Sequence, residues 1–160
     1  MNLSFTVFNR YMQTLIEWSY LGLFIATFLA GSILPFSSEF VLSALLAVGS
    51  NSWGCLFAAT AGNFLGGMSC YYLGHLGKIE WIEKYLGVSD VKMQKAIRFL
   101  NGKGAYMAFF TFVPIIGDLL AVSLGYMRAN VWITSITMLV GKFLRYLVWI
   151  YLTMGVIKLF

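Results

Sequence analysis

This 160-residue chain does not have the composition of a soluble protein. Hydrophobic residues make up 60% of it and charged residues 11%, whereas soluble domains average about 25% charged residues. The formal net charge is +5, but nine of the charged residues lie in one stretch, Lys78 to Lys103, and long uncharged runs lie on both sides of it. This distribution predicts a helical membrane protein with one polar excursion.

The first apolar run predicts a transmembrane helix over residues 14–31, ending at Gly31. The next segment, residues 32–50, is too interrupted for an ordinary span, because it contains Pro35, Glu39 and several serines, among them Ser37, Ser38 and Ser43. We therefore expect residues 32–50 to form a re-entrant hairpin, which enters the membrane and returns to the same side.

A helix is predicted over residues 53–74, where small residues recur with a four-residue period. They line one face, which lets another backbone approach closely: Ala58, Gly62, Gly66, Cys70 and Gly74. That other backbone could belong to the same chain or to a second copy, so a homo-oligomer is left open. Cys55 and Cys70, the two cysteines, are about 22 Å apart along this helix, so we expect no disulfide between them.

The polar excursion over residues 75–104 contains a short amphipathic helix. Lys92, Lys95 and Arg98 share one side of it, and an apolar stripe occupies the other. Such a helix would lie on the anionic leaflet, and short basic loops stay in the cytoplasm, so we place the excursion there. A solvated linker helix is the alternative. Lipid explains the basic stripe more simply than nucleic acid does.

A second interrupted segment follows over residues 105–127, with the helix breakers Pro114, Gly117 and Gly125. Here Asp118 follows Pro114 by four residues, as Glu39 follows Pro35. Paired broken helices are a hallmark of transporters. We therefore predict an all-α integral membrane protein, a helical bundle with two re-entrant helical hairpins in an inverted-repeat arrangement whose tips meet near the centre of the bilayer.

The last segment, residues 130–157, predicts a long transmembrane helix. With 14–31, 53–74 and 130–157 as the spans, the N-terminus is inside and the C-terminus outside. Five conventional spans are the alternative, which would bury Glu39 and Asp118 in continuous helices.

Ionisable residues inside membrane spans are costly and usually face a cavity or a partner. Five are candidates: Glu39, Asp118, Arg128, Lys142 and Arg145. If all five line one cavity, its charge is +1, which favours an anionic head group that arginine can bind through two hydrogen bonds. Glu39 or Asp118 could also carry a coupling proton. The structural alternatives are internal ion pairs and, for Arg128, snorkelling to the interface.

Enzymatic motifs are missing from the sequence. His75 is the lone histidine, and no phosphate-binding glycine loop, nucleophile elbow or metal-ligand spacing is present. We therefore expect no enzyme activity, no cofactor and no metal.

Several motifs together resemble the DedA family, also called the VTT or SNARE-associated family, and its short YqaA-type subgroup most. They lie at Pro35 to Glu39, at Tyr71 to Gly74, at Phe110 to Asp118 and at Gly125 to Arg128, within a resemblance that covers roughly residues 20–150. The resemblance implies two re-entrant hairpins, a bacterial inner-membrane location and, as in several members, movement of phospholipids or polyprenyl-phosphate lipids.

By position, the family's acidic residue of the first hairpin matches Glu39, its second-hairpin proline matches Pro114, and its hairpin-end glycine matches Gly125. Many relatives have arginines around that proline, where this chain has Thr111 and Gly117-Asp118. The phosphate-binding role of those arginines therefore does not transfer.

The first hypothesis for function is a transporter or scramblase of an anionic phospholipid or polyprenyl-phosphate lipid, with proton coupling as an option. The alternatives are a non-transporting envelope-integrity protein that acts through partner contacts on the small-residue face, and a transporter of ions or small solutes.

Overall fold

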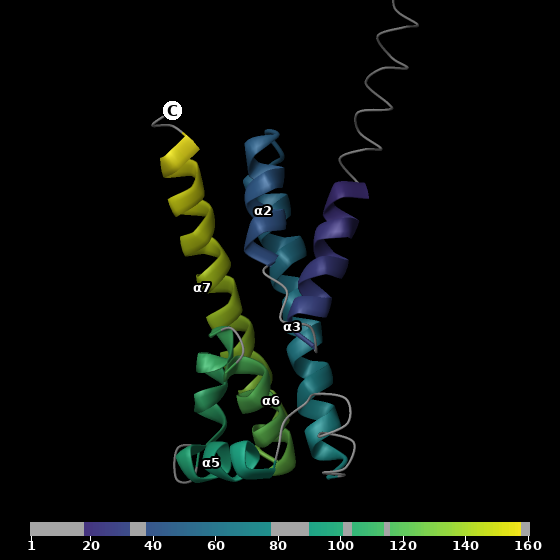
Figure 1. Cartoon of the computed structure of the whole chain (residues 1–160), viewed down its shortest axis with the longest axis vertical. Coiled ribbons are helices and arrows are strands. Elements are labelled where there is room, and N and C mark those ends of the chain that lie inside the picture. The colour runs from purple at the N-terminus through teal and green to yellow at the C-terminus, as the bar shows by residue number, and fades with distance from the viewer. Residues whose placement is uncertain (1–17, 33–37, 78–89, 101–103, 114–115, 158–160) are drawn as a thin grey trace, which may run out of the picture.

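The computed structural model describes residues 18–32, 38–77, 90–100, 104–113 and 116–157. These residues form helices joined by turns, with no strand among them, as the composition predicted. Long helices run along the molecule, and one short helix lies across its lower end (Figure 1).

The first half of the chain contains a helix over Trp18–Ala30, then α2 (Ser38–Ala47) and α3 (Ser52–His75). The second half contains the 3₁₀ helix η1 (Gly104–Phe112), α6 (Ile116–Tyr126) and α7 (Val131–Ile157). Between the halves lies α5 (Asp90–Leu100). In the part of the chain that the structure describes, α7 is the one helix both long and apolar enough to cross a membrane by length and composition.

The first hairpin differs from the predicted one. The helix Trp18–Ala30, predicted as part of a span, ends inside the bundle, where Gly31 packs against Asn63 of α3. The chain then returns through α2, which runs back alongside α7 from Ser38 at Tyr146 to Ser43 at Thr153. The two arms of this hairpin are therefore the helix Trp18–Ala30 and α2, rather than residues 32–50 alone.

The second hairpin lies where the sequence predicted a break. Its first arm, η1, rises along α7, with Ala105 beside Thr137 and Phe109 beside Gly141. Its second arm, α6, returns along α3, where Gly125 packs against Tyr71. The two helical hairpins thus enter the bundle from opposite ends (Figure 1).

Exposed aromatic side chains mark two levels of the bundle. Trp53 and Tyr72 are 60% and 53% exposed on α3, and Trp132 and Tyr151 are 76% and 71% exposed on α7. Each pair is separated by 19 residues, which is about 28 Å of helix. Since tryptophan and tyrosine favour membrane interfaces about 30 Å apart, we call Trp53 and Tyr151 the upper aromatic level and Tyr72 and Trp132 the lower one.

The two halves of the chain are related residue by residue at a constant separation of 79. This separation links Pro35 to Pro114, Glu39 to Asp118, Gly49 to Arg128, Asn51 to Asn130, Trp53 to Trp132, Gly62 to Gly141, Asn63 to Lys142 and Tyr72 to Tyr151. The sequence analysis noticed only the first two pairs. The fold therefore consists of two copies of one motif, hairpin followed by long helix, in opposite orientation.

The turns before the two long helices have the same backbone hydrogen bonds and the same asparagine cap. Gly49 donates its N–H to Leu46 and has a φ of 85°, while the equivalent Arg128 donates to Gly125 with a φ of 52°. Next, the Asn51 side chain accepts the N–H of Trp53 at 2.9 Å, and Asn130 accepts that of Trp132 at 3.0 Å. Each long helix is thus started by a left-handed turn and an asparagine cap.

The small-residue face of α3 is occupied within the chain. Its upper part packs against the helix Trp18–Ala30, where a Cβ on Gly62 would meet the Phe24 carbonyl. Its lower part packs against α6, where a Cβ on Gly74 would meet the Val122 carbonyl. Gly62, Gly66, Cys70 and Gly74 are buried, and Ala58 is half-buried. This face is therefore not free to bind a second protein.

Candidate functional site

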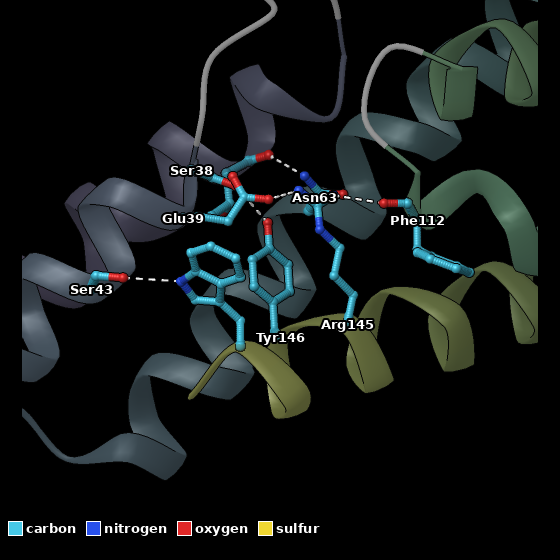
Figure 2. A network of polar contacts seen from close by, with 9 residues as sticks. Ser38, Glu39, Ser43, Asn63, Phe112, Arg145 and Tyr146 are labelled. Carbon is cyan, nitrogen blue, oxygen red and sulfur yellow. Dashed lines mark hydrogen bonds and ion pairs between the residues drawn. The ribbon is translucent and has the colours of Figure 1, made fainter. Parts of the chain in front are cut away.

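Two hairpin tips and α7 meet at the ion pair between Glu39 and Arg145 (Figure 2). Glu39 lies in the first turn of α2, at the tip of the first hairpin. Arg145 also donates from Nη1 to the carbonyl oxygen of Phe112 at 2.9 Å. Phe112 is the last residue of η1, in the second hairpin. A broken helix leaves carbonyl groups without an intrahelical partner, so Arg145 joins the two tips through groups that the breaks expose.

A polar seam continues this contact along α2 and α7. The hydroxyl groups of Ser38 and Tyr146 are 2.9 Å apart in the interior, and the Trp149 indole donates to Ser43 Oγ at 3.0 Å (Figure 2). Farther up, Ser43 Oγ is 3.4 Å from the hydroxyl of Thr153. Hydrogen bonds and one ion pair therefore add to the apolar packing of Leu42 and Leu46 against Tyr146 and Ile150, which holds α2 on α7.

Lys142 lies at the centre of the bundle. Its side chain is 1% exposed, and Nζ donates to the backbone carbonyl of Asn63 at 2.5 Å. Asn63 is ten residues from Trp53, and Lys142 is ten residues from Trp132. The bond thus joins equivalent positions of the two long helices. Each position is about 15 Å along its helix from the aromatic level at which that helix begins, so the bond lies near the midplane between the two levels.

Gly67 makes room for this buried lysine. A Cβ on Gly67 would lie 2.6 Å from Lys142 Nζ and 2.8 Å from the sulfur of Met138. The absence of a side chain on α3 therefore allows the ammonium group of α7 to reach the interior.

Asp118 occupies the position in the second hairpin that Glu39 has in the first. It lies in the first turn of α6 and is half-buried. Asp118 and Lys142 are near enough to interact electrostatically. Glu39–Arg145 is, however, the one ion pair in direct contact among the described residues. Two carboxylates thus lie near two cations of α7. Glu39 and Arg145 are in direct contact, whereas Asp118 and Lys142 are not.

Arg128 lies away from this cluster. It is exposed in the turn after α6, whereas Asp118 is at the other end of that helix, about 15 Å away along its axis. The expectation that five ionisable residues share one space with a charge of +1 therefore does not hold. Glu39, Asp118, Lys142 and Arg145 together carry a net charge of zero.

Helix ends add positive partial charge at the centre of the bundle. Both return arms, α2 and α6, begin at hairpin tips inside the bundle, at Ser38 and Ile116. A helix N-terminus carries about +0.5 of an elementary charge and can bind an anion. Glu39 and Asp118 lie in these first turns, where a carboxylate offsets that potential.

Several residues of the site were not predicted from the sequence. Asn63 donates from its side chain to the Thr27 carbonyl at 3.1 Å and interacts with the Tyr146 hydroxyl. Its signal was available, since it is an amide within a 38-residue run without charge, Phe40 to Gly77. The repeat separation of 79 would have linked it to Lys142. Ser38 and Tyr146 gave no comparable signal, because serine and tyrosine are common throughout the chain.

The predicted breakers Pro35 and Pro114 lie outside the described residues. Among the described residues, no cluster of three His, Cys, Asp or Glu side chains could hold a metal ion. Cys55 and Cys70 are free and buried, as expected from their spacing.

Residues 34–154 match the VTT domain family, so the chain belongs to this family of membrane proteins, also called DedA. The match covers α2, α3 and α6 and most of α7.

Two similar proteins support this assignment over most of their length. The inner membrane protein YqaA of Escherichia coli is 33% identical over 129 residues, 80% of this chain and 86% of that protein. An uncharacterized protein of Haemophilus influenzae is 31% identical over 140 residues, 82% and 85% of the two chains. The name of YqaA supports a bacterial inner-membrane location.

The uncharacterized membrane protein YkoX of Bacillus subtilis is 26% identical over 142 residues, 84% of this chain and 62% of that protein. No solved structure matches the chain.

Proposed function

We propose that the protein transports a lipid with an anionic, phosphate-bearing head group across the bacterial inner membrane. One observation carries the proposal: two half-length hairpins enter from opposite ends, and Arg145 joins their tips, with Glu39 on one side and the Phe112 carbonyl on the other. Broken helices that meet at mid-membrane are the usual place of a transporter's binding site. The hairpins are then re-entrant, and α3 and α7 are the spans that enclose them.

The surroundings of the ion pair favour a lipid over a small solute. Arg145 and Glu39 keep 17% and 16% of their side-chain surface exposed. Large apolar side chains close to them in sequence are exposed, namely Phe40 at 78%, Leu144 at 42% and Val148 at 57%. A head group can therefore approach from the bilayer while its acyl chains stay in lipid.

The head group is expected to be anionic although the four charged side chains are neutral in sum. Two helix N-termini add positive potential there, and an incoming phosphate would compete with Glu39 for Arg145 and accept two hydrogen bonds from it. Binding would thus break the contact that closes the tips. Transport needs no covalent chemistry in this scheme, and coupling to a proton on Glu39 or Asp118 is an option within it.

The experiment is lipid translocation in liposomes that contain only the purified protein, with labelled anionic and neutral lipids compared. We expect faster movement of the anionic lipid and a loss of about tenfold or more in two variants. In Arg145→Gln the phosphate loses charge-assisted hydrogen bonds that contribute about 1.4 kcal/mol or more, and in Glu39→Gln the carboxylate that holds Arg145 between the tips before lipid binds is lost. Arg128→Gln is the matched control, because it removes an exposed cation outside the cluster.

Absence of translocation by folded, inserted protein would reject the proposal. Equal loss in Arg128→Gln would show that general charge, not this cluster, controls the rate. The alternative of an envelope protein acting through partners would need a surface other than the occupied face of α3.

A further inference from the structure

The short helix α5 lies across the lower end of the bundle (Figure 1). Its Met93 and Leu100 belong to the same core as Leu124 of α6, and Ala129 and Val131 pack against that core. Val131 precedes Trp132, which marks the lower aromatic level. α5 therefore lies at the depth where lipid head groups would begin.

One side of α5 is fixed to the second hairpin. Met93, Ala96 and Leu100 are 2%, 6% and 0% exposed, and the Ser123 hydroxyl of α6 is 3.7 Å from the sulfur of Met93. These contacts fix which face of α5 is buried against α6. The residues on the opposite face therefore point away from the bundle.

The outward side is basic with an apolar edge. Lys92, Lys95 and Arg98 are all exposed, and Val91 beside them is 65% exposed. Cations next to an exposed apolar side chain are the composition of a helix that lies in a membrane interface. Each lysine or arginine near an anionic leaflet strengthens binding about fivefold.

We infer that this face of α5 binds the acidic head groups of the leaflet at the lower aromatic level. The charge of the face is complementary to acidic phospholipid, and its depth and orientation place it in the plane of those head groups. Because α5 packs on α6, the bound leaflet also restrains the second hairpin. The inference requires that the protein lies in a membrane, but it does not depend on which molecule is transported.

The test compares the full-length protein in nanodiscs of phosphatidylcholine alone and of phosphatidylcholine mixed with phosphatidylglycerol. Backbone amide exchange of α5 is measured by mass spectrometry at low salt. We expect exchange to be slower by about fivefold or more with the acidic lipid, and the difference to shrink at high salt, since screening weakens exposed charges.

The variant Lys92→Gln, Lys95→Gln, Arg98→Gln should lose this lipid dependence, while Arg128→Gln should keep it. Exchange of α3 and α7 amides in the same samples shows whether the variant is folded. Equal α5 exchange of the unaltered protein in both lipids would overturn the inference and support a solvated linker helix. A lipid dependence that persists in the triple variant, or that vanishes also in Arg128→Gln, would overturn it as well.

Discussion

The two halves of this chain follow the same path but are held together differently. In the second half, η1 and α6 pack by close backbone approach, with Phe109 against Gly141 and Tyr71 against Gly125. In the first half, buried leucines of α2 pack against Tyr146 and Ile150 of α7, and hydrogen bonds and the Glu39–Arg145 ion pair add to this packing. Backbone packing offers no free polar group to a ligand, whereas these polar contacts can be exchanged for contacts with one. The α2–α7 contact is therefore the one that the proposed transport would use.

The long helices α3 and α7 carry different kinds of side chain at equivalent positions. At the positions where α7 has Lys142, Arg145 and Tyr146, α3 has Asn63, Gly66 and Gly67. One helix thus supplies the charges, and its counterpart supplies the space that accommodates them, as at Gly67.

The largest effect is expected from enlarging a glycine in the second half. In Gly125→Ala, the added Cβ would overlap the Tyr71 carbonyl, so the helices must separate, at a cost of about 3 kcal/mol in the free energy of unfolding. Thermal unfolding in detergent or nanodiscs measures it. Gly155→Ala is the matched control, since a Cβ there meets nothing within 4 Å, and it should be neutral or slightly stabilising. Equal stability of the two variants would refute the tight packing of α6 on α3.

The ion pair should show coupling of about 2 kcal/mol in a double-mutant cycle. Arg145→Met leaves Glu39 uncompensated and should destabilise the protein, whereas Glu39→Gln together with Arg145→Met should recover most of the loss. Thermal unfolding of the four proteins gives the coupling. If the stability loss of the double variant equals the sum of the two single losses, Glu39 and Arg145 are not coupled and other contacts hold the tips together.

A smaller effect, about 1 kcal/mol, is expected for Gly67→Ala, because the methyl group must displace the ammonium group of Lys142 from the Asn63 carbonyl. The cost should largely disappear when Lys142 is already replaced by Met. A Gly67→Ala penalty that is the same in both backgrounds would mean that the methyl group clashes with something other than Lys142, such as Met138.

The smallest effect compares the two equivalent turns. Arg128→Gly should stabilise the protein by about 0.5 kcal/mol by relieving a left-handed backbone, with lipid translocation unchanged. Gly49→Ala should destabilise it by about 1 kcal/mol, because Gly49 has the same left-handed conformation with a φ of 85°. If Arg128→Gly is folded but has lost translocation, Arg128 is needed for transport and belongs to the functional site.

The sequence predicted the helical class, the long helices and the break in the second hairpin, because apolar length and proline act locally. It misplaced the first hairpin, since an uncharged run of adequate length looks the same whether it crosses or turns back. It also grouped Arg128 with the central residues, because linear order does not reveal that α6 carries the chain away from Asp118. The pairing of Arg145 with Glu39 joins helices distant in sequence, and no local pattern encodes it.

Under the proposed function, the equal 19-residue separation on α3 and α7 would make bilayer thickness a variable of transport. Both long helices would match the same hydrocarbon width, so a thicker or thinner membrane would act on both at once, through tilt or local deformation of the lipid. Re-entrant hairpins would reach only part of the way across, and a change in tilt of the long helices would alter how far the two tips overlap. Lipids of different chain length would then open or close the Glu39–Arg145 contact without any change in the protein.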